Sequence, residues 1–362
     1  MDPARVLLSV TERIKQRARS LGFDAVAIGR ADVPLDLDFE RYEDFIREGM
    51  HGEMEWLAAH RQARQRLDTD RVLDGARSVI CVARSYARPP ADERDDPSTA
   101  QAIARYARGK DYHAFLRRKV RRLAAFVRTF STPGVSVRAR PLCDEEPVLE
   151  RAWAARAGLG FVGKSGMLIV PGLGSLVLLG EVVTTLELAA DAPIAERCGS
   201  CTRCLDACPT HAFIRPFVLD ARRCIAYMTI EQKSPVEDVD RPSMGTHLFG
   251  CDDCQTVCPF NASARATKNQ GDGGPFSPLE RWHHTPLEAL LAMDDAGWTE
   301  LSAGSPLRRA GRAHAACGAA IVLANRGEVA ALPALRRAAE THDDPTVRAT
   351  AAWAIARLAV PN

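Results

Sequence analysis

The chain has 362 residues, of which 46% are hydrophobic and 26% are charged, and its formal net charge at pH 7 is +2. This length and composition predict a full hydrophobic core and more than one domain, and the near-zero net charge excludes a global polycation. No segment approaches the roughly 18 consecutive apolar residues of a membrane-spanning helix, so we expect no membrane association.

The first predicted element is an amphipathic helix at the start of the chain. Its apolar side carries Val6, Leu7, Val10, Ile14 and Leu21. The segment has neither the apolar core of a signal peptide nor a twin-arginine leader. We therefore expect a cytoplasmic protein, in which thiols stay reduced and clustered cysteines indicate metal rather than disulfides.

Residues 1–185 alternate helical and strand patterns. Strands are predicted over 23–29, 78–83 and 176–184, because these runs are apolar and rich in β-branched residues. Loops containing proline and acidic residues are predicted at 32–40 and 88–98. The alternation predicts a mixed α/β domain with a sheet covered by helices.

One predicted helix in this part is strongly basic. Its core side carries Leu116, Val120, Leu123, Phe126 and Val127. Its basic residues are Arg117, Arg118, Lys119, Arg121, Arg122 and Arg128. The pattern is typical of a solvated helix face, and contact with a polyanion is the alternative.

A glycine-rich segment at 158–165 matches both the dinucleotide fingerprint and the P-loop pattern. Both motifs need a strand before the glycines and a helix after them, so that phosphate meets a helix N-terminus. Here the order is reversed, with a helix predicted over 147–157 and a strand over 167–170. We expect no nucleoside triphosphate site, and instead a turn where a bulky cofactor approaches the backbone.

Eight of the eleven cysteines lie between residues 198 and 258. The first run has the bacterial ferredoxin spacing followed by proline, in which the fourth cysteine ligates the other cluster. This crossover rule gives one cluster the ligands Cys198, Cys201, Cys204 and Cys258. It gives the second cluster Cys208, Cys224, Cys251 and Cys254. Paired zinc sites are the alternative, but the spacing favours two 4Fe–4S clusters.

The remaining cysteines, Cys81, Cys143 and Cys317, are predicted to be packing residues. Residues 186–265 hold too few apolar side chains for an independent core, so metal is expected to stabilise them. Residues 266–285 are predicted to be a linker.

From residue 286 the chain is predicted to be helical and rich in alanine. Helices over 313–324, 328–340 and 345–358 have the spacing of HEAT repeats, and a plain helical cap is the alternative. Arginines suited to a phosphate backbone occur throughout this tail: Arg308, Arg309, Arg312, Arg336, Arg337, Arg348 and Arg357.

Several motifs in combination resemble those of epoxyqueuosine reductases. They lie at 105–113, 144–151, 157–165, 174–175, 179–181, 250–255 and 258–261, together with the cysteine array. The similarity extends over nearly the whole chain. It implies an α+β fold with a nitroreductase-like cobalamin-binding domain at 1–185 and a ferredoxin-like domain with two 4Fe–4S clusters at 186–265. A linker at 266–285 and a HEAT-like, tRNA-binding helical tail at 286–362 would follow.

The resemblance also implies a reaction and a set of site residues. Members of this family remove the epoxide oxygen of epoxyqueuosine in tRNA, using cobalamin and two 4Fe–4S clusters. Asp144 matches the proton donor, and Lys233 matches a position near the tRNA. The positions that match cobalamin contacts are Arg66, Tyr106, Asp144, Leu168, Leu179, Ala226, Cys251 and Asp252. The chain has no D-x-H-x-x-G motif, which implies a base-off cofactor.

A carboxyl group that acts as an acid near neutral pH needs a pKa raised above its usual value of about 3.9. Without the resemblance, the acidic residues 144–146 would instead predict a helix N-terminus. Electrons would come from an external low-potential donor, namely a reductase, a flavodoxin or a ferredoxin, and a monomer is expected. A reductive dehalogenase-type enzyme and a pure electron-transfer protein are the alternative functions.

Overall fold

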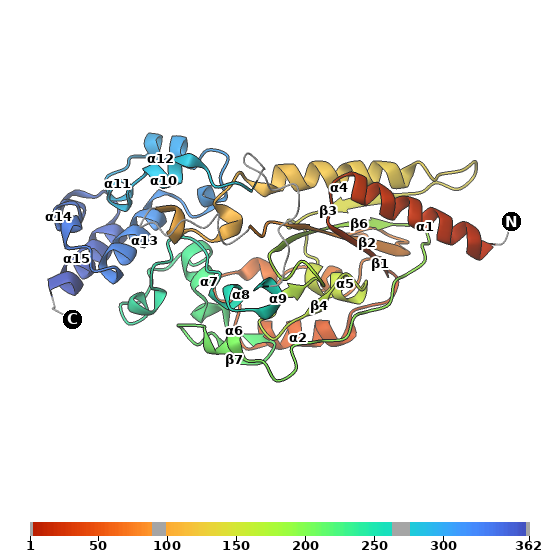
Figure 1. Cartoon of the computed structure of the whole chain (residues 1–362), viewed down its shortest axis with the longest axis horizontal. Coiled ribbons are helices and arrows are strands. Elements are labelled where there is room, and N and C mark those ends of the chain that lie inside the picture. The colour runs from red at the N-terminus through yellow and green to blue at the C-terminus, as the bar shows by residue number, and fades with distance from the viewer. Residues whose placement is uncertain (1–2, 89–98, 263–275, 360–362) are drawn as a thin grey trace.

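The computed structural model describes residues 3–88, 99–262 and 276–359, with side chains from residue 8 onward. The molecule is elongated, with the sheet and its helices at one end and a helical tail at the other. The cysteine-rich segment lies against the middle, and the termini are at opposite ends (Figure 1).

A four-stranded sheet forms the core of the first part. Its strands, in spatial order, are β1 (Ala25–Arg30), β2 (Ser78–Ser85), β6 (Val177–Thr184) and β3 (Ala139–Leu142). All neighbours are antiparallel, and Glu181 of β6 lies opposite Cys81 of β2 and Leu142 of β3. The three predicted strands are confirmed within two residues at each end, because their apolar runs are buried in the sheet.

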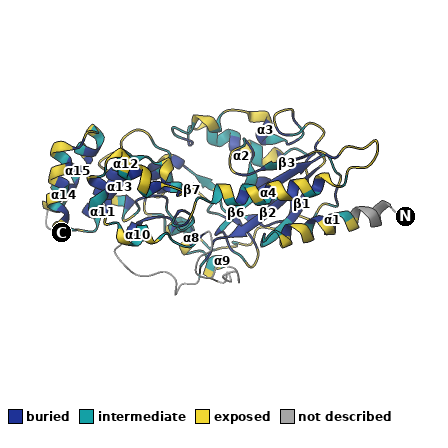
Figure 2. Cartoon of the chain, turned by 90° about the horizontal axis from the view of Figure 1, so that it is seen from above, coloured by how far each residue is buried: buried dark blue, intermediate teal, exposed yellow. Residues whose placement is uncertain are grey.

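Helices cover both faces of this sheet. On one face, α1 (Pro3–Ser20) and α4 (Tyr112–Arg128) pack through Ile14 and Leu123 against Ile80. On the other face, α5 (Glu150–Arg156) buries Trp153 against Val79 and its neighbours. Figure 2 shows the buried sheet between exposed outer helix faces. The alternation of side chains along each strand thus supplies two separate cores.

The first part also contains two helices, α2 (Asp36–Arg47) and α3 (Arg61–Gln65). A two-stranded sheet is formed by β4 (Phe161–Val162) and β5 (Leu168–Ile169). The loop predicted at 32–40 is wrong in its second half, because α2 begins at Asp36. Acidic residues in the first turn of α2 suit the positive end of a helix dipole. The loop predicted at 88–98 lies outside the described residues except for Arg88.

The cysteine-rich segment consists of short elements. They are α6 (Arg203–Asp206), β7 (Phe213–Arg215), β8 (Val218–Leu219), α7 (Ile225–Ile230), α8 (Asp253–Thr256) and α9 (Pro259–Ala262). Its buried side chains around Tyr227 and Met228 form a small cluster that also includes Ile321 of the tail, and Leu248 and Phe249 belong to the core of the tail. That the segment needs metal to fold stays a prediction.

The tail is helical, as predicted. Its helices are α10 (Glu280–His284), α11 (Leu287–Leu291), α12 (Asp295–Ser302), α13 (Arg312–Asn325), α14 (Leu332–Thr341) and α15 (Pro345–Ala359). The predicted linker is wrong at its end, because α10 lies there and its Trp282 is fully buried. The rest of that linker lies mostly outside the described residues.

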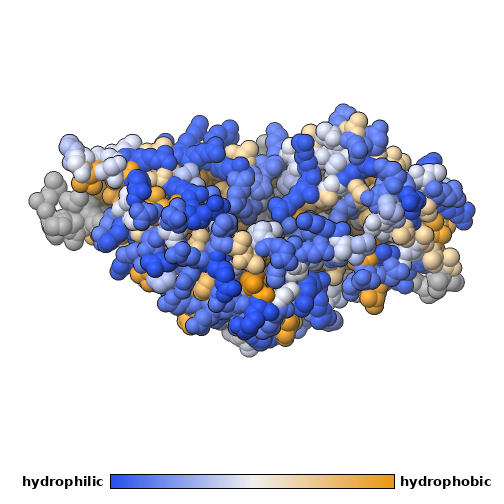
Figure 3. Space-filling view, turned by 180° about the vertical axis from the view of Figure 1, so that it is seen from behind, coloured by the Kyte–Doolittle hydropathy of each residue, from blue (hydrophilic) through white to orange (hydrophobic). Residues whose placement is uncertain are grey.

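Hydrophilic side chains dominate the face of the molecule shown in Figure 3, and apolar ones are scattered across it. Within the described residues, every helix is too short or too polar to cross a bilayer.

Candidate active site and cluster ligands

The eight cysteines of the array are partly buried free thiols. Electrostatic interactions link Cys204 to Cys198, Cys201 and Cys258. They also link Cys224 to Cys208, Cys251 and Cys254, and Cys254 to Cys204, so the two groups adjoin each other. The eight thiols are therefore close together, and their division into the two sets of the crossover rule stays a prediction.

The chemistry of these donor sets fits iron–sulfur clusters. Burial raises the pKa of Cys198 to about 11 and the pKa of Cys254 to about 12, so thiolates here require a cationic partner. The backbone N–H of Ala212 lies 3.3 Å from the Cys208 sulfur, a contact of the kind that tunes cluster potentials.

The glycine-rich segment follows α5 and runs through β4, and it joins the sheet domain to the cysteine array. Its glycines lie around β4, and Lys164 Nζ donates to the carbonyls of Gly199 and Cys201 at 2.6 and 3.0 Å. A Cβ at Gly163 would lie 3.5 Å from the Cys198 sulfur and 2.6 Å from Ile169. The glycines therefore allow a close approach to the chain's own backbone and cysteine loop, and the approach of a bulky cofactor expected from the sequence stays a prediction.

A cavity of about 930 Å³ lies where the three parts of the chain meet. The first part contributes Tyr106, Tyr112, His113 and Asp144 among others, and the cysteine-rich segment contributes Ile230, Glu231 and Phe249. The tail contributes Arg308 and Arg309. This volume is at the upper end of the range for ligand sites, and the lining combines aromatic, acidic and basic groups.

Asp144 lies on the wall of this cavity with its side chain about half exposed. Tyr112 Oη donates to Asp144 Oδ2 at 2.5 Å, and His113 Nε2 lies 3.1 Å from the same oxygen. The other ring nitrogen of His113 lies 2.7 Å from Asp111 Oδ1, which fixes the imidazole between two carboxylates. Asp144 adopts a left-handed backbone conformation, with φ of 58°.

The pKa of Asp144 is lowered. Burial pushes this pKa upward, but the hydrogen bonds from His113 and Tyr112 outweigh burial and stabilise the carboxylate. Asp144 therefore lacks the raised pKa that it would need to act as an acid without a partner. The same contact with Asp144 raises the pKa of His113, so of the two groups the imidazole is the one that holds the shared proton more firmly.

The helix-cap alternative for the acidic residues is wrong. Helix α5 begins at Glu150, and its N-cap residue is Leu149, without a side-chain cap. Sequence reasoning missed Tyr112 and His113 as partners of Asp144, although both lie in the motif at 105–113. The signal available was Asp111, which caps α4 and thereby orients the two following side chains.

The other predicted cofactor positions are dispersed around the cavity. Tyr106 lines it with Asp144, whereas Arg66 pairs with Asp68 at 2.7 Å and Leu168 is buried in β5. Leu179 packs on the sheet core, Ala226 lies in α7 and Cys251 belongs to the cysteine array. The carboxylate of Asp252 is buried and accepts the backbone N–H of Arg105 at 2.7 Å.

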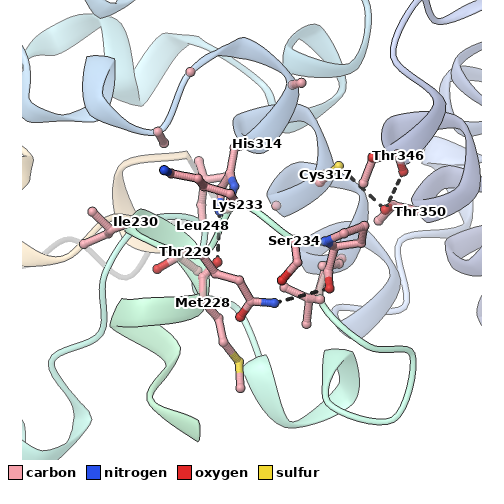
Figure 4. A pocket seen from close by; sticks show the side chains of 18 of the residues that line it. Met228, Thr229, Ile230, Lys233, Ser234, Leu248, His314, Cys317, Thr346 and Thr350 are labelled. Atoms are coloured by element: carbon pink, nitrogen blue, oxygen red, sulfur yellow. Dashed lines mark hydrogen bonds between the residues drawn. The ribbon is translucent and has the colours of Figure 1, made fainter. Parts of the chain in front are cut away.

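Lys233 lies in a second cavity, of about 550 Å³, between the cysteine-rich segment and α13 and α15. Figure 4 shows Lys233 near His314, with Thr350 and Cys317 on the opposite wall. The structure thus places Lys233 apart from Asp144, although Ile230 and Arg309 border both cavities.

Two family profiles match the chain. One, described as "4Fe-4S double cluster binding domain", matches residues 197–261. The other, described as "Epoxyqueuosine reductase QueG, DUF1730", matches residues 66–144.

Curated relatives extend the similarity over most of the chain. The epoxyqueuosine reductase of Gloeobacter violaceus is 43% identical over 82% of this chain and 90% of its own length. That of Escherichia coli is 34% identical over 97% of this chain and 90% of its own length.

Solved structures give the same result. An epoxyqueuosine reductase with an epoxyqueuosine-modified tRNA-Tyr stem loop has a TM-score of 0.84 and 31% identity, covering 97% of this chain and 90% of that one. The Bacillus subtilis enzyme, with a catalytic aspartate loop swung out of its active site, has a TM-score of 0.85 and 31% identity, covering 98% and 91%.

Proposed function

The chain belongs to the epoxyqueuosine reductase family, and from this we propose that it reduces the epoxide of epoxyqueuosine in tRNA to give queuosine, with Asp144 as proton donor. It is an oxidoreductase. The family relationship favours this activity over a dehalogenase-type reductase or a pure electron-transfer protein. The observation that carries the role of Asp144 is its hydrogen-bonded carboxylate on a cavity that the cysteine-rich segment also lines.

The reaction consumes two electrons and two protons and yields an alkene and water. We propose base-off cobalamin and two 4Fe–4S clusters as the electron carriers. When bound, they supply low-potential electrons to the carbon–oxygen bond of the epoxide, and iron–sulfur potentials extend down to about −700 mV. Tyr106 and Asp144 on the cavity wall, with Asp252 and Cys251 nearby, would adjoin the cobalamin.

The chain's own residues manage the protons. Because the pKa of Asp144 is lowered and that of His113 is raised, the resting proton belongs to the His113 imidazolium. His113 passes it to Asp144 Oδ2 across their 3.1 Å contact, and Asp144 delivers it to the oxygen leaving the epoxide. Solvent then reprotonates His113, and the second proton follows the same path to complete the water molecule. Hydrogen bonds from Tyr112 to Asp144 and between Asp111 and His113 hold the carboxylate and the imidazole in place.

Replacing Asp144 by Asn tests this role. The amide keeps the size of the side chain but cannot carry the acidic proton, so turnover of epoxyqueuosine-containing tRNA should fall about 100-fold to 10,000-fold. The measurement is anaerobic turnover by reconstituted protein, with both clusters and the corrin quantified by absorption spectroscopy. Unchanged turnover with the cofactors bound would remove Asp144 from the reaction.

A second variant tests the proposed cluster ligands. Cys224→Ser should remove the cluster held by Cys208, Cys224, Cys251 and Cys254 and leave the other intact, lowering bound iron by about half. Cys317→Ser, outside both sets, is the matched control. Equal iron in Cys224→Ser and wild-type protein would contradict the assignment.

We further propose that the tail helices form HEAT-like repeats that contact the tRNA, with Lys233 near the substrate. An external reductase, flavodoxin or ferredoxin would supply electrons to a monomeric enzyme. Its tRNA substrate supports a cytoplasmic location.

A further inference from the structure

A second carboxyl pair lies beside Asp144 and has no part in the proton path described above. Glu181, in the middle of β6, is 1% exposed, and neither of its carboxylate oxygens has a hydrogen-bond donor among the described residues. Strand alternation directs Glu181 to the same sheet face as Val183, where α5 packs. Glu150, the first residue of α5, is its electrostatic neighbour.

No ion pair neutralises these two carboxyl groups within the described part of the chain. The adjacent Arg151 acts on Glu150 through its charge, which opposes the rise in the pKa of Glu150, but its guanidinium donates to the carbonyl of Gly166. The facing groups from β2 and from the end of β3 are Cys81 and Cys143, and burial raises the pKa of both thiols, which keeps them neutral. The other charged groups nearby are Asp144 and, on α4, Arg117, which pairs with Glu145.

One proton on the Glu150–Glu181 pair would remove the repulsion between the two carboxyl groups. Two ionised carboxylates would repel each other in a buried site, and neither could donate a hydrogen bond. Burial and the charge of Glu150 raise the pKa of Glu181 well above its ordinary value. Burial and Asp144 raise the pKa of Glu150 to about 7, while the hydrogen bond from the Asp144 N–H opposes that rise.

The pair is connected to the reactive group through the backbone. The N–H of Asp144 donates to Glu150 Oε1 at 2.8 Å. Because Asp144 has a φ of 58°, in the left-handed region that favours glycine, its turn needs contacts that hold it in place. This conformation directs the Asp144 side chain toward Tyr112 and His113.

We propose that Glu150 and Glu181 are positioning residues. Glu181 stays protonated at neutral pH and donates a hydrogen bond to Glu150, and Glu150 in turn accepts the backbone N–H of Asp144 and holds it in place. The inference rests on the proposed role of Asp144 as proton donor.

The first test compares two substitutions of Glu150 in the full-length, cofactor-loaded protein. In Glu150→Gln the side-chain carbonyl still accepts from the Asp144 N–H, so kcat should stay within about threefold of wild type. In Glu150→Ala the acceptor is lost, and hydrogen exchange of the Asp144 amide should become about tenfold faster, as for one lost hydrogen bond. A similar fall in kcat with an unchanged KM should accompany it.

The second test concerns the proton on Glu181. Wild-type protein should show the infrared carbonyl band of a neutral carboxyl group at pH 8, and Glu181→Gln should lack it. Since the Gln amide can donate to Glu150 in place of the acid, this variant should keep wild-type turnover. Glu187→Gln, an exposed substitution just beyond β6, is the control and should retain both the band and turnover.

These outcomes distinguish the positioning role of Glu150 and Glu181 from the proton-donor role of Asp144. Wild-type amide exchange and kcat in Glu150→Ala would overturn the positioning role, even with Asp144 essential. Absence of the band in wild-type protein, or an inactive Glu181→Gln, would show that Glu181 acts as an anion and overturn the retained proton. Activity in Asp144→Asn would refute the proton-donor role, whereas the amide exchange and the infrared band would still report on the pair.

Discussion

At the residue scale, the proton path depends on contacts between positions that are distant in sequence. The two proposed cysteine sets were accessible to sequence analysis because ligand spacing along the chain is itself a geometric constraint. The partners of Asp144 were not, because His113 is 31 residues away and reaches Asp144 only through the packing of α4 beside β3. The same packing reversed the expected direction of the Asp144 pKa shift.

The assignment of the resting proton to His113 predicts a specific pH dependence. The pKa of His113 is raised from 6.5, so the imidazolium persists above that pH and is lost as the pH rises through the raised value. Turnover of wild-type protein should therefore fall on the alkaline side with a one-proton slope. In His113→Gln the amide still donates to Asp144 but does not titrate, so turnover should be about 100-fold lower and flat across this limb.

Steady-state turnover from pH 6 to pH 9, with saturating reductant, measures this effect. Replacing His60, another histidine that lines the cavity, by Gln is the comparison and should leave the alkaline limb in place. An unchanged limb in His113→Gln would place the resting proton elsewhere.

At the element scale, sequence patterns predicted the central strands well and the short elements poorly. The apolar runs of β1, β2 and β6 predict buried strands because burial on both sheet faces leaves little choice of residue. In contrast, α2 follows a proline-containing stretch rich in acidic residues, and these features obscured it. The glycine-rich motif around β4 matches sequence patterns of phosphate sites, and only the fold shows which elements surround it.

Lys164 connects the segment around β4 to the cysteine loop, and these contacts lead to a prediction. Its ammonium group holds the loop that carries Cys198 and Cys201 through two carbonyl contacts. Lys164→Met should keep the aliphatic stem but lose both contacts, which lowers the free energy of unfolding by about 1–3 kcal/mol. Because the loop presents cluster ligands, bound iron should also be retained less well during dilution.

Chemical denaturation of the reconstituted protein and iron analysis after gel filtration measure the two effects. Lys110→Met, an exposed substitution in the loop before α4, serves as the control. If both variants match wild-type protein, the contacts of Lys164 contribute nothing to the loop.

At the scale of the whole molecule, the three parts share cores and cavities more than their sequence boundaries suggest. Ala100–Ala107 and the pair Leu248 and Phe249 pack in one core with the tail helices. A boundary drawn from composition places these segments in other domains, because no local pattern reveals a long-range partner. The shared core brings Arg308 and Arg309 of the tail to the rim of the cavity that holds Asp144.

This placement predicts how tRNA binding depends on the tail. Arg308 is exposed on the cavity wall, whereas Arg309 pairs with Glu231 at 2.8 Å, so Arg308 is the freer cation to meet a phosphate. Arg308→Gln should weaken tRNA binding and reduce the slope of log affinity against log salt by about 1. Arg19→Gln on α1, equally exposed but at the other end of the molecule, removes the same charge without approaching the cavity.

Filter binding of epoxyqueuosine-containing tRNA from 50 to 300 mM KCl, run in parallel on both variants, distinguishes a local contact from a general loss of charge. A local contact changes the slope in Arg308→Gln alone. Equal changes in both variants would mean that the tRNA responds to net charge, and the cavity rim would lose its role as the docking surface.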